Sequence, residues 1–275
     1  MAAETPLNDT GMSFWEHLEE FRKVLIRSVI VLLVLMVVIF LNKTFVFETI
    51  IFAPRSSDFV FYKWLESLSR LLNIPSMAPE PFKLELQNIE LAAQFFTHIN
   101  ISLSLALVLG TPFILYQLWL FVKPALYERE RKAAVRAFLW CSFLFFLGVL
   151  VGYFFVFPLT INFLGNYRVT DWVHNQITLQ SYIHMFTWLI LIMGIVFEMP
   201  VLLRVLSKIG IISKDFLKKH RKHAFVILLI LAAIITPSGD AFTLFIVTIP
   251  LYLLYEASIL VSYNKKSEED EKVAA

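Results

Sequence analysis

The sequence predicts an all-α, polytopic membrane protein with six transmembrane helices and with both the N-terminus and the C-terminus in the cytoplasm. Hydrophobic residues make up 58% of its 275 residues, more than in ordinary soluble domains. Six apolar runs are separated by polar connections, and Lys and Arg gather in alternate connections. Because basic residues in short loops favour the cytoplasmic side, this alternation places both termini and the connection around Lys132 in the cytoplasm.

Composition narrows the classes of function. The net charge is only +2, so no overall field attracts nucleic acid. The single cysteine, Cys141, provides neither a disulfide framework nor a cysteine metal site. The sequence contains no Walker-type glycine loop and no metal-ligand cluster. We therefore expect no cofactor, no metal, no nucleic-acid partner and no enzymatic activity.

The apolar runs define one domain. We expect a flexible N-terminus over residues 1–12, a six-helix domain over residues 13–264 and a disordered cytoplasmic tail over residues 265–275. The spans are expected at about residues 24–40, 99–122, 133–159, 182–206, 224–236 and 242–263. The segment before the first span is acidic and amphipathic and lacks the features of a cleaved signal peptide, so we expect it to be retained.

The first two runs flank the longest connection. Ser13 and Glu16 fit a capping box, which predicts an amphipathic helix on the membrane surface that then turns inward. The extracytoplasmic loop, about residues 41–98, has helical apolar spacing from Phe59 to Leu72, typical of an interfacial helix. Pro112 should bend the second span.

The later runs carry glycine and proline signals. Gly148 and Gly152 are four residues apart in the third run, a spacing that permits close helix contact. Phe157-Pro158 is expected to end that span. The fifth run has only about twelve to fourteen residues and reaches about 20 Å, against a hydrocarbon core of about 30 Å. If this run did not cross the membrane, Lys265 and Lys266 would lie on the far side from the other basic segments. We therefore expect short fifth and sixth spans in a locally thinned bilayer.

A carboxylate lies inside the fourth run. Glu198 has apolar residues on both sides, and burying it there costs several kcal/mol unless it is protonated, paired or hydrated. Pro200 frees a backbone carbonyl near the same depth. The structural interpretation is a hydrogen bond to a neighbouring helix. The functional interpretations are a proton or ion relay, or a polar docking point for a partner helix.

Two charged segments are candidates for a cytoplasmic binding site. The connection from Lys123 to Lys132 alternates carboxylates with cations. A topology signal is the simpler interpretation, but orientation gains little from Glu, which favours binding. Glu20 before the first span either pairs locally with Lys23 or takes part in the same site.

With these motifs assembled, the chain resembles the TatC component of the twin-arginine protein translocase. The matching segments are His17–Arg22, Ala53–Pro54, Pro112–Trp119, Lys123–Arg131, Gly152–Pro158, Phe197–Pro200, and Thr236–Pro237 followed by Asp240. They occur in order over nearly all of residues 13–264. The long first loop and the Ser238-Gly239 insertion before Asp240 depart from the family pattern.

The resemblance implies a concave, TatC-like bundle and roles for particular residues. The residues implied for binding twin-arginine signal peptides are Glu20, Glu130, Arg22, Phe121, Tyr127 and Arg131. Glu198 is implied to contact a partner helix. The implied structural or assembly positions are Pro54, Phe95, Pro112, Tyr153, Pro200 and Asp240.

The expected function is therefore a signal-peptide receptor and core subunit of a translocase that exports folded proteins by the proton-motive force. The expected partners are TatA- or TatB-type single-span proteins, further copies of this chain and the lipid of a bacterial inner membrane. One alternative is a proton-coupled small-solute transporter using Glu198. Another is an intramembrane enzyme, with candidates Cys141, His184, Glu198 and Glu256 that no spacing brings together.

Overall fold

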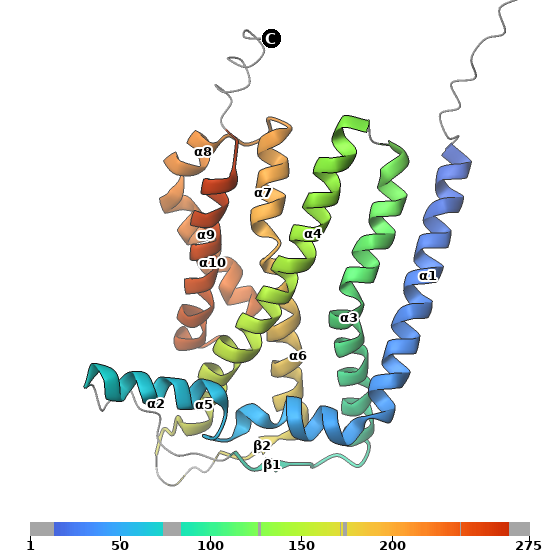
Figure 1. Cartoon of the computed structure of the whole chain (residues 1–275). Helices are drawn as coiled ribbons and strands as arrows, with labels where there is room; N and C mark the ends of the chain where they lie inside the picture. The colour runs from blue at the N-terminus through green and yellow to red at the C-terminus, as the bar shows by residue number, and fades with distance from the viewer. Residues whose placement is uncertain are drawn as a thin grey trace, which may run out of the picture.

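A computed structural model describes residues 14–73, 84–125, 128–170, 172, 175–236 and 238–263. Its helices run roughly side by side in one bundle (Figure 1). The all-α membrane fold is confirmed, with five helical segments long and apolar enough to cross a bilayer in the described part of the chain. The predictions for residues 1–12 and 265–275 lie outside the described residues.

The elements follow the predicted runs in order. The first run is α1 (Phe14–Leu41), followed by η1 (Phe45–Ile51), η2 (Ala53–Arg55) and α2 (Val60–Leu72). The second and third runs are α3 (Ala93–Val122), η4 (Lys123–Ala125), α4 (Glu128–Val151), η5 (Gly152–Val156) and α5 (Phe157–Asn166). The remaining helices are α6 (Leu179–Val196), α7 (Met199–Lys208), α8 (Lys214–Lys219), α9 (Arg221–Ile235) and α10 (Ala241–Val261).

The two ends of the bundle differ in chemistry. One end holds the start of α1, α4 and α9, the end of α3, α7 and α10, and α8 (Figure 1). We call it the basic end because of its Lys and Arg residues, which include Lys123, Lys132, Arg136, Lys208, Lys214, Lys218 and Lys219. The opposite end holds α2, α5 and a parallel ladder between β1 (Leu86–Gln87) and β2 (Ile177–Thr178). This small ladder joins two loops and was not expected from the sequence.

Three details differ from the sequence-based expectations. The prediction of a separate surface helix before the first span is wrong, because α1 is one uninterrupted helix from Phe14 to Leu41. Pro158 does not end the third span. It lies in the first turn of α5, directly after the π-helical segment η5, and the helix continues to Asn166. The sixth span is not short, since the 21 residues of α10 reach about 31 Å.

The fifth run is short, as expected. The 15 residues of α9 reach only about 22 Å, less than the roughly 30 Å of a hydrocarbon core. The turn from α9 to α10 lies above the lower ends of α3 and α6 in Figure 1. The Trp188 indole of α6 donates to the Ile235 carbonyl at 2.7 Å, which fixes the end of α9 to the bundle at that level.

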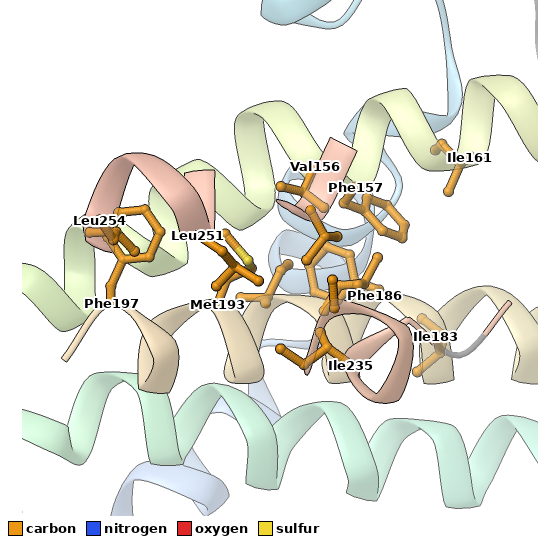
Figure 2. Close-up of a cluster of buried hydrophobic side chains, with 14 of the residues drawn as sticks. Val156, Phe157, Ile161, Ile183, Phe186, Met193, Phe197, Ile235, Leu251 and Leu254 are labelled. Atoms are coloured by element: carbon orange, nitrogen blue, oxygen red, sulfur yellow. The ribbon is translucent and has the colours of Figure 1, made fainter. Parts of the chain in front are cut away.

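The buried core surrounds α6, which contacts α3, α4, α5 and α9. Figure 2 shows Phe186 and Met193 of α6 among side chains of the third, fifth and last helical runs. The Phe157 and Phe186 rings meet edge to face at 5.0 Å, and Phe157, Met193 and Leu251 are fully buried. Because helices in lipid gain little from apolar burial alone, such close packing is what holds α6 in place.

Gly148 and Gly152 allow α4 to approach α6 closely. A Cβ atom on Gly148 would lie 2.4 Å from the Met193 carbonyl oxygen, and one on Gly152 would lie 3.3 Å from the Ile190 Cα. Both neighbours are backbone atoms, so they cannot yield as a flexible side chain would. The glycine pair in the sequence therefore marks a real helix contact.

Three tyrosine hydroxyls secure the opposite end. Tyr153 donates to the Ile50 carbonyl at 2.9 Å, Tyr182 to the Ile51 carbonyl at 2.7 Å, and Tyr62 to the Pro158 carbonyl at 2.8 Å. Two of these acceptors belong to η1, a π-helical segment in which the regular ladder is wider. The Tyr153 contact joins η5 to η1.

Candidate functional site

The first part of the candidate site lies at the basic end, where α1 meets α3. Phe121, in the last turn of α3, stacks on His17 of α1 with ring centroids 4.2 Å apart. The Phe21 ring is 5.3 Å from the same Phe121 ring. These contacts fix the start of α1 against the end of α3. Glu20 lies in the same turn of α1, between His17 and Phe21. The stacked His17 was not singled out from the sequence, although its spacing of four from Phe21 puts both rings on one helix face.

Glu20 already has a cationic neighbour. The Lys23 ammonium lies 2.8 Å from the Glu20 carboxylate and 3.6 Å from that of Glu19. The side chain of Glu20 is 44% exposed, and ion pairs as exposed as this one contribute little to stability. The local pairing with Lys23 is thus present, but it is weak enough to be replaced by a better cation.

The second part of the candidate site is only partly described. Tyr127 and the side chain of Glu130 lie outside the described residues, whereas the backbone of Glu130 belongs to the first turn of α4. Arg131 is half-buried, and its Nε has no hydrogen-bond partner in the described part of the chain. Arg22 is exposed. The convergence of Glu20 and Glu130 therefore remains a prediction.

The helix order nevertheless relates the two parts. α1 packs on α3, and α3 packs on α4, so α3 lies between the other two, as Figure 1 shows. Trp119 of α3 and Phe138 of α4 have ring centroids 5.6 Å apart, which ties these two helices near the same end. Glu20 and Glu130 thus belong to helices on either side of α3.

A separate feature occurs inside the fourth span. α6 ends at Val196, α7 begins at Met199, and Glu198 lies in the break between them. Pro200 has no N–H to donate to the Val196 carbonyl, which explains the interruption. The Phe197 side chain is 4% exposed and would touch any side chain placed on Gly148, so the break is held firmly against α4.

The Glu198 carboxylate is shielded. Both oxygens are buried and have no hydrogen-bond partner in the described part of the chain, although the residue as a whole is partly exposed. The Cys141 thiol of α4 lies beside it, in a geometry short of a hydrogen bond. The sequence analysis did not bring these two residues together. The available signal was the seven-residue spacing from Cys141 to Gly148, two helical turns on the α6-facing side.

The other predicted positions have simpler surroundings. Pro54 is buried in η2, Pro112 lies within the uninterrupted α3, and Phe95 is 58% exposed. Glu256 pairs with Arg221 at 2.8 Å, and His184 is exposed. The four residues of the enzyme alternative therefore do not form one cluster.

Asp240 caps α10. Its carboxylate accepts a hydrogen bond from the Thr243 backbone N–H at 2.7 Å and another from the Ser238 hydroxyl. Burial acts to raise the pKa of Asp240, but these hydrogen bonds outweigh it and hold the pKa below its usual value. Gly239, with φ of +61°, supplies the left-handed turn before the cap. The Ser238-Gly239 insertion is thus part of the capping structure.

The long apolar helices define a multi-pass α-helical membrane protein. The family model for Sec-independent protein translocase protein (TatC) matches residues 16–250. The chain belongs to the TatC family, and it is therefore a component of a Sec-independent protein translocase.

Relatives match over nearly the whole chain. A TatC protein of Blattabacterium sp. subsp. Periplaneta americana is 41% identical over 92% of this chain and 95% of its own length. A TatC protein of Aquifex aeolicus is 34% identical over 95% of this chain and 100% of its own length. A crystal structure of the twin-arginine translocase receptor TatC in the detergent DDM has a TM-score of 0.66 and 34% identity, covering 90% of this chain and 99% of that one.

Proposed function

We propose that this chain is the signal-peptide receptor subunit of its translocase and that it binds the paired arginines of export signals at the basic end. The observation that carries this proposal is the stacking of Phe121 on His17, which anchors α1 beside α3 and so presents Glu20 next to the charged connection into α4. The similar solved structure is described as a receptor.

The geometry suits a pair of arginines more than one. Glu20 and Glu130 lie on helices that flank α3. Successive side chains of an extended segment point in opposite directions, so consecutive arginines can reach carboxylates on two sides of one helix. Each guanidinium can bind a carboxylate through two parallel hydrogen bonds, which an ammonium cannot do. We therefore propose that Glu20 exchanges Lys23 for a guanidinium when the peptide binds, while Phe121 and Tyr127 shape the pocket and Arg22 and Arg131 position it.

A peptide-binding assay tests this function. The purified chain in lipid nanodiscs should bind a fluorescent signal peptide carrying Arg-Arg at least about tenfold more tightly than the same peptide carrying Lys-Lys, equivalent to about 1.4 kcal/mol. A peptide with the two arginines separated by five residues is a control of equal charge. Equal affinities for all three peptides would show that only net charge is recognised and would contradict the proposal.

We further propose that the membrane-facing part of the chain recruits the translocation partners. An unpaired carboxylate inside the hydrocarbon is costly, and a polar group from a TatA- or TatB-type helix would relieve this cost at Glu198. Because its oxygens are buried in the isolated chain, the Glu198 side chain must turn outward when a partner binds. In this proposal α9 is a short fifth span that brings the number of spans to six and thins the bilayer locally. Several copies assemble, and the proton-motive force drives transport.

The replacement Glu198→Gln separates docking from proton transfer. Gln keeps the size and hydrogen-bonding capacity of Glu but cannot release a proton. If Glu198 is a docking point, this variant should retain at least about half of the export rate, whereas Glu198→Leu should lose most of it. Export of a folded reporter in cells measures both, and Glu256→Gln on α10 serves as a control.

The same variants test a second candidate function, a proton-coupled small-solute transporter. It is favoured by one observation, a shielded carboxylate at the break of a discontinuous helix. Abolition of export in both Glu198 variants would replace the docking role by proton relay. Solute uptake into vesicles containing only this chain would favour the transporter.

A further inference from the structure

The face of α4 that points away from α6 carries exposed cations next to exposed apolar side chains, and the proposed function assigns no role to this face. A shallow hollow of about 280 Å³ is lined by Arg136, Leu139, Trp140 and Phe143. These residues recur at intervals of three, four and seven, so they form one stripe on the helix. The contacts of Gly148 with α6 come from a different side of α4. The stripe is therefore part of the outer surface of the described bundle.

The stripe changes from charged to apolar with depth. Lys132 lies one turn before Arg136, on the same face and towards the basic end, and both side chains are exposed. Neither forms an ion pair with a described carboxylate. Phe143 lies seven residues beyond Arg136, which is about 10 Å deeper along the helix. This places the two cations near the headgroups and the rings among the upper acyl chains.

The apolar part of the hollow has a defined shape. Trp140 and Phe143 meet edge to face with ring centroids 5.7 Å apart, and their side chains are 54% and 57% exposed. Leu139 is 66% exposed. Tryptophan is favoured at the membrane interface because its ring is apolar while its N–H can reach polar groups. A rigid aromatic corner next to two cations is more selective than a uniform aliphatic surface.

We propose that this stripe is a binding site for an anionic phospholipid. The phosphate group binds the Arg136 guanidinium and the Lys132 ammonium, and one acyl chain lies in the hollow against Leu139, Trp140 and Phe143. Charge complementarity selects an anionic headgroup, because basic residues clustered at the end of a transmembrane helix attract anionic lipids. The apolar depth below the cations selects a lipid over a free phosphate, which would leave the hollow unfilled.

Lipid titration of the purified full chain tests the site. Native mass spectrometry should show phosphatidylglycerol binding about tenfold more tightly than phosphatidylcholine, since the two cations attract an anionic headgroup. The double variant Lys132→Gln/Arg136→Gln should lose this preference. The matched control is Lys218→Gln/Lys219→Gln, which removes two exposed cations of α8 at the same end of the bundle and should keep the preference.

A second readout locates the acyl chain. Phosphatidylglycerol brominated in its upper acyl chain should quench the fluorescence of Trp140, seen as the difference between the original chain and Trp140→Phe. Thermal melting in detergent verifies that each variant is folded. The proposal is overturned if phosphatidylcholine binds equally well, if the α8 variant loses the preference as the α4 variant does, or if Trp140→Phe leaves the quenching unchanged.

Discussion

Replacing both Glu20 and Glu130 by Gln should weaken binding of a twin-arginine signal peptide by about a hundredfold. Hydrogen bonds to charged groups contribute more than neutral ones, and each variant removes one carboxylate acceptor pair. Each single variant should lose about tenfold. Fluorescence anisotropy with a labelled peptide in nanodiscs measures all three.

Glu19→Gln is a matched control for this prediction. Glu19 adjoins Glu20, and its carboxylate approaches the same Lys23 at 3.6 Å, but no role in binding is proposed for it. Its removal should change the affinity less than about threefold, the range expected of an exposed pair. An equal loss in the Glu19 and Glu20 variants would show that only the local charge matters.

The second large effect is expected for Gly148→Ala. The added methyl group would lie 2.4 Å from the Met193 carbonyl oxygen and 2.7 Å from the Phe197 Cβ, so α4 and α6 must separate. Overpacking of this kind typically lowers the free energy of unfolding by about 1–3 kcal/mol. Here the methyl group would clash with a backbone atom, which cannot rotate away. The variant should melt several degrees lower in detergent and should accumulate poorly in the membrane.

Gly110→Ala provides the comparison for Gly148→Ala. Its added methyl group would approach the Leu32 Cδ2 at 2.7 Å, but that atom is the end of a side chain that can rotate away. We therefore expect a smaller loss of thermal stability than for Gly148→Ala. If the two variants lose the same stability, the close approach of α4 and α6 is not the reason for glycine at position 148.

The positions of the helices could be predicted from the sequence because apolar runs and basic connections are direct consequences of the bilayer. Helix ends likewise depend on local residues. Ser213 caps α8 by accepting a hydrogen bond from the Phe216 N–H at 3.1 Å, and Gly210 adopts a φ of +80° at the preceding turn. Such caps depend only on neighbouring residues, so a sequence pattern is sufficient to find them.

Features that depend on packing could not be predicted in the same way. The continuation of the third span beyond Pro158 depends on η5, a π-helical turn that no local pattern specifies. The β1–β2 ladder pairs residues about ninety positions apart, and two-residue strands leave no periodicity. The approach of Cys141 to Glu198 arises because glycines let α4 meet the break in the fourth span.

The candidate binding site could be predicted from the sequence only in part. The charges of the Lys123–Lys132 connection were visible in the sequence, and the structure adds the contact of Phe121 with α1 that positions Glu20. The resemblance to TatC proteins assigned the roles of these residues, while their spacing alone left a topology signal as the simpler explanation. The structure adds that α1 and α4 both pack on α3, the arrangement that the proposed shared site requires.

The most direct test of the account is to place a photocrosslinking amino acid between the two arginines and the apolar segment of a signal peptide and to map its adducts on this chain by mass spectrometry. The account predicts adducts on both sides of α3, in α1 around Glu20 and in the first turns of α4 around Glu130, and their loss with a Lys-Lys peptide. Adducts confined to α8 and α9, or unaffected by the Lys-Lys replacement, would contradict it.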